Sequence, residues 1–180
     1  MKLHYVSPFR FIKFIALCVA LILQFGCASN DKKNALALPS TPSASSNHMA
    51  ASEALKLQGH PYVPGGESPQ EGFDCSGLVY YVYNKQGVKL PRNTWSLASQ
   101  LPSVQIEQRQ PGDLVFFNTS DHAFSHVGIY VGNDQFVHAP SSKTGRVMVS
   151  SLSQPYWRQR FNALRRPYHH HISTAANRRF

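Results

Sequence analysis

The sequence predicts an α+β domain in which N-terminal helices pack on one face of an antiparallel sheet. Segments with helical periodicity occupy the chain up to about residue 101, and segments with the composition of β-strands follow. The strand segments are joined by short connections, which favour antiparallel pairing between neighbours. Helices first and strands afterwards are typical of the α+β class. With 42% hydrophobic residues among 180, the chain has enough apolar side chains for a core.

Three helices are expected in the first part of the domain. The first covers residues 49–59, "MAASEALKLQG", and ends at a glycine. The second covers about residues 75–86, with Asp74 at the N-cap position and Gly87 after the last turn. The third is the shorter segment "NTWSLASQ" at residues 93–100. Each assignment depends on a start or stop signal that lies within the segment or next to it.

Five strand segments are expected in the second part. They are rich in β-branched and aromatic residues, which suit a half-buried pleated surface. The segments are "DLVFFN" at 113–118, "HVGIYV" at 126–131, "QFVHA" at 135–139, "RVMVSS" at 146–151 and "RFNALRRP" at 160–167. Because the connections are short, we expect an antiparallel meander.

The N-terminus has the organisation of an export signal. Lys2, Arg10 and Lys13 precede an apolar run, "FIALCVALILQF", at residues 14–25. A transmembrane helix needs roughly 20 apolar residues, so this run is too short to be one. We therefore expect residues 1–26 to be a signal peptide.

The junction that follows the apolar run resembles a bacterial lipobox. Gly26 precedes Cys27, which would then be lipidated and become the mature N-terminus. Ala28 after the cysteine resembles the sorting signal for the outer membrane, with the protein facing the periplasm. Gln24 departs from the pattern, which prefers an aliphatic residue there. Ordinary cleavage after Ala28 is the alternative, and it would give a soluble periplasmic protein.

The remaining chain divides into three parts by composition. Residues 27–48 are rich in Ser, Ala, Asn and Pro and are expected to be a flexible tether behind the lipid. Residues 49–167 are expected to be the folded domain, and residues 168–180 a basic, His-rich tail. Removal of the signal peptide takes away three positive residues and lowers the formal net charge from +9 to +6.

Cys75 is expected to be the one thiol of the folded domain, and its position favours a nucleophile. Cys18 leaves with the signal peptide and Cys27 would carry lipid, so Cys75 has no partner for an internal disulfide. A single cysteine in an exported protein points to a reactive thiol or to intermolecular pairing. At the start of a helix, backbone N–H groups and the helix dipole lower a thiol pKa. The competing interpretation is a small buried hydrophobic side chain.

A thiolate nucleophile needs a base, and the hairpin geometry selects two histidines. His126 opens one strand segment and His138 lies in the next. A three-residue loop over 132–134 places both imidazoles on one face, with Cβ atoms ~5–8 Å apart. A two-residue loop would place them on opposite faces.

Six segments, in order, resemble the NlpC-type cell-wall cysteine peptidases: "PYVPGG", "FDCSGLV", "LPRNTWSL", "PGDLVFF", "SHVGIYVG" and "FVHAP". The resemblance covers about residues 50–167 and implies a papain-like α+β fold. It further implies that Cys75 is the nucleophile and His126 the general base. His138 would orient His126, and Tyr62 would help to stabilise the oxyanion.

The same resemblance implies the substrate and the partners. The substrate would be the stem peptides of peptidoglycan, cut at the crosslink between meso-diaminopimelate and D-Ala. Cleavage between D-Glu and diaminopimelate is the alternative. We expect no cofactor, a monomer, and contact with the membrane through the N-terminal lipid.

Two other function classes compete with a peptidase. Cys75, His126 and His138 can be arranged as a zinc site with an open position, and a non-catalytic envelope lipoprotein is also compatible with the chain. The excess of Lys and Arg over Asp and Glu is typical of nucleic-acid binding. We expect no nucleic-acid partner, because the export signal separates the chain from cytoplasmic DNA.

Overall fold

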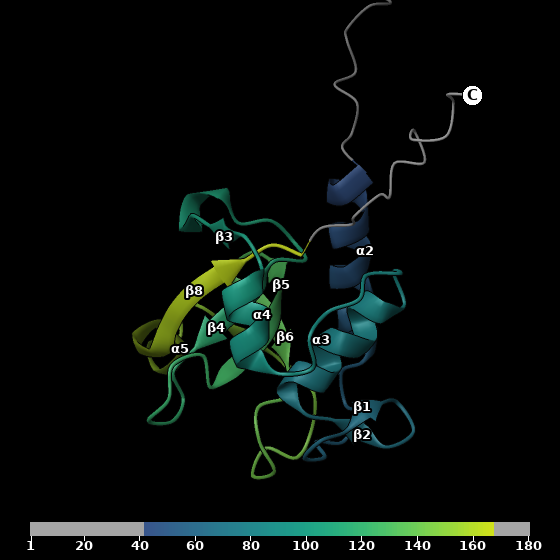
Figure 1. Cartoon of the computed structure of the whole chain (residues 1–180). Coiled ribbons are helices and arrows are strands. Elements are labelled where there is room, and N and C mark those ends of the chain that lie inside the picture. The colour runs from purple at the N-terminus through teal and green to yellow at the C-terminus, as the bar shows by residue number, and fades with distance from the viewer. Residues whose placement is uncertain (1–41, 168–180) are drawn as a thin grey trace, which may run out of the picture. The chain divides into compact units, whose positions relative to one another are not determined.

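The structure is a computed structural model that describes residues 42–167 (Figure 1). The expected signal peptide, Cys27 and the His-rich tail lie outside the described residues. The helices are α2 (Pro42–Lys56), α3 (Cys75–Asn84), α4 (Thr94–Gln100), the 3-10 turn η1 (Ile106–Gln108) and α5 (Pro155–Arg160). The strands are β1 (Glu67–Ser68), β2 (Gly72–Phe73), β3 (Ser103–Val104), β4 (Leu114–Phe117), β5 (His126–Gly132), β6 (Gln135–His138), β7 (Met148–Ser151) and β8 (Phe161–Arg165). Within this part of the chain, no helix combines the length and apolar character that crossing a membrane requires.

The main sheet is antiparallel, as expected, but it is not a simple meander. Its order is β3-β8-β4-β5-β6-β7, so only β4 to β7 follow one another along the chain. After β7 the chain passes through α5, and β8 returns to pair with β4 on the other side. The expectation of a meander of five strands is therefore wrong for the last strand. Short connections predict pairing between neighbours, and the return of β8 is a long-range pairing that they do not encode.

Helices α2 and α3 pack on one face of the sheet, which confirms the predicted α+β class. The buried stripe Leu78, Val79 and Val82 of α3 belongs to the same core as Phe116 and Ile129 of the sheet. The opposite face has a smaller core around Trp157 of α5. The sheet therefore has a large core under α2 and α3 and a second, aromatic one under α5.

Helix α2 begins earlier than the sequence predicts. It starts at Pro42, so residues 42–48, which by composition belong to the tether, are helical. Ser46 and Asn47 are 5% and 2% exposed, because this turn packs on the rest of the domain. At Gly112 a Cβ atom would lie 2.3 Å from the carbonyl oxygen of Asn47, which shows how closely the two backbones approach. Ser, Asn and Ala give a weak helical pattern, so composition does not reveal this packing.

A small hairpin covers the start of α3, where the sequence predicts only a loop. Strands β1 and β2 pair antiparallel, and Tyr62 forms a bridge with Phe73 of β2. At Gly77 in α3 a Cβ atom would lie 2.0 Å from the carbonyl oxygen of Gly66. A side chain at position 77 would therefore push this hairpin away from the helix.

The β5–β6 hairpin has a different turn from the expected one, but the same consequence for the histidines. The turn has two residues, Asn133 and Asp134, both with positive φ as a type I′ hairpin requires. One extra residue, Val131, forms a bulge between the pairs Tyr130↔Phe136 and Gly132↔Gln135. The two-residue turn alone would place His126 and His138 on opposite faces. The bulge adds one residue and returns both to the same face.

Candidate active site

The start of helix α3 is built by a side-chain cap. Asp74 has an extended backbone, and its Oδ1 accepts a hydrogen bond of 2.7 Å from the backbone N–H of Gly77. Its Oδ2 accepts a second one, of 2.9 Å, from the N–H of Gly65. This confirms the predicted N-cap and ties the helix to the loop before β1. Cys75, the first residue of the helix, lies within the short segment that the contact between Asp74 and Gly77 closes.

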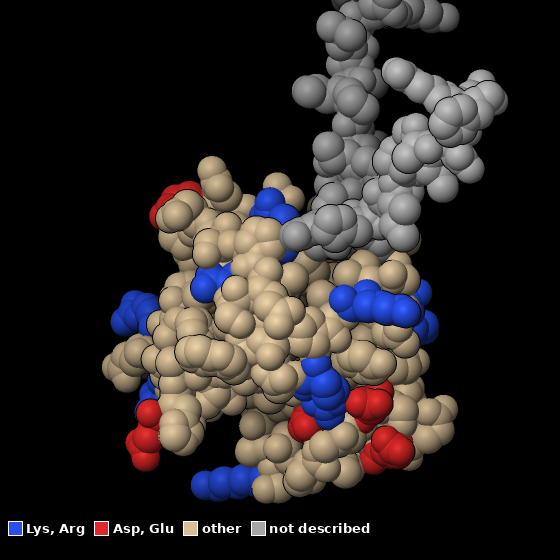
Figure 2. Space-filling view, in the orientation of Figure 1, with Lys and Arg blue, Asp and Glu red and all other residues tan. Residues whose placement is uncertain are grey.

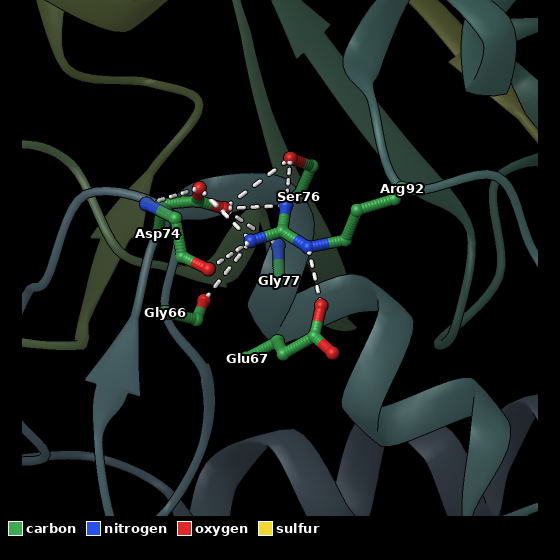
Figure 3. A network of polar contacts seen from close by, with 7 residues as sticks. Gly66, Glu67, Asp74, Ser76, Gly77 and Arg92 are labelled. Atoms are coloured by element: carbon green, nitrogen blue, oxygen red, sulfur yellow. Dashed lines mark hydrogen bonds and ion pairs between the residues drawn. The ribbon is translucent and has the colours of Figure 1, made fainter.

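Arg92, to which no sequence pattern assigns a role, fixes this cap from the other side (Figure 3). Its Nη1 and Nη2 donate to the two carboxylate oxygens of Asp74 at 2.9 and 3.0 Å. Its Nε donates to Glu67 at 2.8 Å, and its Nη1 also lies 2.8 Å from Oγ of Ser76. Burial raises the pKa of Asp74, but Arg92 and the capping N–H groups outweigh it and hold that pKa below its ordinary value. The residues on both sides of Cys75 are therefore fixed by one ionic network.

The thiol of Cys75 is partly exposed and unpaired, and its pKa differs in direction from the expectation. Burial raises the pKa of Cys75, and the nearby carboxylate of Asp74 raises it further. Hydrogen bonding from backbone N–H groups, that of Val127 first among them, lowers it by less. The prediction of a lowered thiol pKa is therefore wrong for the free protein, because the helix-start argument neglects desolvation and the anionic cap. The contact with Val127 also places the thiol beside the first residues of β5.

The two selected histidines contact each other. Nε2 of His126 lies 2.8 Å from Nδ1 of His138, and the side chains are 3% and 0% exposed. The second ring nitrogen of His138, Nε2, lies 2.8 Å from Oγ of Ser150 on β7. Since Nε2 of His126 is engaged, Nδ1 is the ring nitrogen of His126 left for a further partner.

Burial keeps both imidazoles neutral at physiological pH. It lowers the pKa of His126 to about 4. For His138, burial first and then the neighbouring His126 lower the pKa as well. No carboxylate contributes to either shift. A neutral imidazole can accept a proton, which is the state a general base needs.

Trp157 and Gly128 shape the histidine pair. The indole of Trp157 stacks on His126 with a centroid distance of 5.5 Å and meets His138 edge-on at 4.7 Å. At Gly128 a Cβ atom would lie 3.2 Å from Cβ of His138. The contact of Trp157 with the imidazoles depends on the return of the chain through α5, for which no local sequence signal exists.

Tyr62 lies close enough to Cys75 for the two groups to interact electrostatically. Burial raises the pKa of Tyr62, and the negative charges of Cys75 and Asp74 raise it further. The phenol therefore stays protonated at neutral pH and keeps a hydrogen to donate. Its backbone is fixed by a hydrogen bond of 2.9 Å from its N–H to the carbonyl of Gly145.

A zinc site is not supported by the described residues. Among residues 42–167, no group of three His, Cys, Asp or Glu side chains has the arrangement of a metal site. His138 would have to supply a ring nitrogen, yet one of its nitrogens faces His126 and the other faces Ser150. The three residues are therefore better described as a pair of hydrogen-bonded imidazoles and a thiol that contacts the backbone of Val127, the residue after His126.

Comparison with known proteins identifies the fold. A model of the NlpC/P60 family matches residues 59–166, which include Cys75, both histidines and Tyr62. The chain belongs to the NlpC/P60 family. A crystal structure of an NLP/P60-family protein from Staphylococcus aureus superposes on 69% of this chain and 42% of that protein, with a TM-score of 0.63 and 37% identity. The expected papain-like α+β fold of the NlpC/P60 family is thereby confirmed.

Two curated relatives carry enzymatic names. The Murein DD-endopeptidase MepS/Murein LD-carboxypeptidase of Escherichia coli is 43% identical over 102 residues, which cover 56% of this chain and 53% of that protein. The Gamma-DL-glutamyl hydrolase of Bacillus subtilis is 43% identical over 119 residues, which cover 63% of this chain and 28% of that protein. The chain therefore spans about half or less of the curated relatives it matches.

The surface charge is dispersed on the face drawn in Figure 2. Lys and Arg side chains are separated there by uncharged surface, and one cluster contains both signs. Arg92 illustrates such pairing, because its guanidinium contacts the carboxylates of Asp74 and Glu67. The positive net charge does not form one continuous patch on this face.

Proposed function

We propose that the domain is a cysteine peptidase that hydrolyses peptide bonds in the stem peptides of peptidoglycan. The observation that carries this proposal is the contact of 2.8 Å between His126 and His138, together with the hydrogen bonding of the Cys75 thiol to the backbone of Val127, the residue after His126. A family domain with a thiol and an oriented neutral imidazole has the parts of nucleophilic catalysis. The name of the Escherichia coli relative, a murein endopeptidase, supports the same substrate class.

Catalysis would begin with transfer of the Cys75 proton to Nδ1 of His126. The thiolate sulfur then forms a bond with the substrate carbonyl carbon, and the carbonyl oxygen takes the negative charge. The phenol hydrogen of Tyr62 is available to stabilise this oxyanion. The carbon–nitrogen bond breaks as His126 returns its proton to the leaving amine, which leaves an acyl-enzyme.

Hydrolysis would complete the cycle with the same imidazole. His126 removes a proton from water, the hydroxide attacks the thioester, and the sulfur leaves and regains the proton. Burial disfavours an isolated thiolate and an isolated imidazolium alike. The two charges would therefore form together, within one proton transfer, and stabilise each other.

The proposal is tested by replacing the nucleophile. Cys75→Ala should abolish cleavage of purified muropeptides, followed by mass spectrometry, and leave the melting temperature nearly unchanged because Ala suits a helix. Cys75→Ser should be nearly inactive, since an alcohol is far less ionised than a thiol at neutral pH. Retention of more than a few per cent of activity in Cys75→Ala would refute the assignment. Sensitivity to iodoacetamide together with indifference to chelators would separate a thiol enzyme from a zinc enzyme.

The histidine roles are tested with a matched control. His126→Ala should lose activity as completely as Cys75→Ala, because thiolate and imidazolium act as a unit. His138→Ala should keep a measurable remnant, since water can partly replace an orienting group. His122 is exposed and lies outside the pair, so His122→Ala should stay near wild-type activity. An essential His122 and a dispensable His126 would contradict the proposed roles.

The bond that is cut is proposed to be the crosslink between meso-diaminopimelate and D-Ala. The two relatives named above have the same identity, 43%, yet one name denotes a DD-endopeptidase and the other a DL-glutamyl hydrolase. Similarity alone therefore does not choose between the crosslink and the bond between D-Glu and diaminopimelate. Digestion of crosslinked dimers separates them: monomeric tetrapeptides support the crosslink, and truncated stems support the alternative.

We further propose that the protein is an outer-membrane lipoprotein anchored through Cys27. The support is the Gly26–Cys27–Ala28 junction directly after the apolar run. Labelled palmitate should enter the full-length protein in a bacterial host and be lost in Cys27→Ser. A mature N-terminus at Ser29 without an acyl chain would instead establish a soluble periplasmic enzyme.

A further inference from the structure

One more polar side chain is buried in line with the histidine pair. Ser150 lies on β7 and is 7% exposed, and its Oγ is 2.8 Å from Nε2 of His138. The opposite ring nitrogen of His138 is 2.8 Å from Nε2 of His126. The three side chains therefore form a single buried chain of hydrogen bonds that ends at the serine hydroxyl.

The direction of the protons along this chain decides which nitrogen of His126 is basic. A neutral imidazole carries one N–H, so each ring donates on one side and accepts on the other. If Ser150 accepts from Nε2 of His138, then Nδ1 of His138 accepts from Nε2 of His126, and Nδ1 of His126 is free. If Ser150 donates instead, every bond reverses and Nδ1 of His126 carries the proton. In that state His126 cannot accept a proton from the thiol at Nδ1.

The charged state of the proposed mechanism admits one direction only. When His126 has taken the thiol proton, both of its nitrogens carry hydrogens, and its Nε2 must donate to Nδ1 of His138. His138 is then neutral only if its own hydrogen is on Nε2, which faces Ser150. The direction from His126 to His138 to Ser150 therefore serves the neutral and the charged state without rearrangement.

We propose that Ser150 is a positioning residue that accepts a hydrogen bond from Nε2 of His138 and thereby keeps Nδ1 of His126 free to act as the base. The inference rests on the proposed function. Ser150 does not touch the substrate in this scheme; it acts through His138. Removing its hydroxyl leaves the buried N–H of His138 without an acceptor. The free energy lost in this way corresponds to about a tenfold change in rate.

The first test observes the protons directly and needs no activity. Long-range ¹H–¹⁵N correlation on the ¹⁵N-labelled protein at pH 7 distinguishes the two neutral tautomers of each histidine, and the His138→Ala variant assigns the signals. We expect the hydrogen on Nε2 in both His126 and His138. A hydrogen on Nδ1 of His138 in the wild-type protein would overturn the proposal. In Ser150→Ala we expect His138 to populate both tautomers.

The second test is kinetic and has a matched control on the same strand. Ser150→Ala should lower kcat for muropeptide cleavage about tenfold and leave KM within about twofold, because substrate contacts are untouched. Ser150→Thr, which keeps the hydroxyl and suits a strand, should recover most of kcat. Ser151→Ala removes a hydroxyl that bonds Ser153 instead, so it should match the wild type. Equal kcat in Ser150→Ala and Ser151→Ala would overturn the proposal.

The outcomes also separate this proposal from the one on which it rests. A wild-type protein that cleaves no muropeptide refutes the peptidase, whatever its tautomers are. An active wild type whose Ser150→Ala variant is equally active refutes only the role of Ser150. If Ser150→Ala fails to fold, the histidine tautomers of the wild type and the activity of Ser150→Thr still test the role of Ser150.

Discussion

Gly128 is the position at which a single methyl group should uncouple the histidine pair. Its side-chain direction points to the face that carries the imidazoles, because it follows His126 by two residues on β5. A Cβ atom there would lie 2.7 Å from Cδ2 of Phe136, 3.0 Å from the carbonyl oxygen of Val137 and 3.2 Å from Cβ of His138. Gly128→Ala therefore forces β6 to move, and His138 moves with it.

The size of the effect follows from these distances. Inserting a methyl group into a packed site costs about 1–3 kcal/mol, and for a domain of this length that corresponds to a fall in Tm of roughly 3–10 °C. A displacement of about 1 Å can cost on the order of 100-fold in rate. A shift of a few tenths of an ångström in His138 should lower kcat/KM about tenfold or more. Thermal melting and muropeptide digestion measure the two quantities separately.

Gly87→Ala is the matched control for Gly128→Ala. Gly87 has a φ of +74°, and no heavy atom lies within 4 Å of the place that an added methyl group would take, so its substitution strains only the backbone after α3. The cost is about 1 kcal/mol or more, similar to that at Gly128, but the histidines are untouched. We expect a comparable fall in Tm with activity retained. If Gly128→Ala stays as active as Gly87→Ala, the reasoning about His138 is refuted.

Three further predictions concern charge and packing. Because burial lowers the pKa of His126 to about 4, kcat/KM should persist through pH 5 and decline only near pH 4. A profile of kcat/KM against pH with its midpoint near 6.5 would contradict a buried base. Arg92→Ala should lower the free energy of unfolding by about 1–3 kcal/mol at pH 7. Since the folded pKa of Asp74 is depressed, the part of this contribution that depends on Asp74 is present above its unfolded pKa and is lost as pH falls through the folded value. The difference between the urea titrations of the two proteins should therefore shrink below about pH 4, to what the hydrogen bonds of Arg92 to Ser76 and to two backbone carbonyls contribute. Trp157→Ala should lower the free energy of unfolding by about 3–5 kcal/mol, whereas Trp157→Phe should keep the fold and part of the activity. Melting curves and muropeptide digestion measure the two effects.

The features that the sequence predicts correctly are those with local signals. Asp74 is recognisable as a cap because a capping side chain lies within three residues of the N–H it binds. The pairing of His126 with His138 follows from strand parity, although a bulge at Val131 takes the place of the expected longer loop. Each of these inferences concerns residues close together along the chain.

The features that the sequence does not predict depend on contacts between distant segments. Ser150 reaches His138 from the next strand, and Trp157 reaches it from α5 after the chain has crossed the sheet. The direction of the Cys75 pKa shift depends on burial, which arises only when α3 packs against β5. Sequence patterns predict a thiol nucleophile and its base, but they do not encode the environment of either group.

The bulge at Val131 lets a tight two-residue turn close the hairpin while Tyr130 still pairs with Phe136. The face on which His138 emerges is set by this pair and not by the number of residues beyond it. Residues added between Gly132 and Gln135 should lengthen the turn and leave the active site intact, whereas a slip of β6 by one residue along β5 would turn His138 to the other face. The tip of the hairpin is therefore usable for grafting a binding loop, as long as the pairs Ile129↔Val137 and Tyr130↔Phe136 are kept.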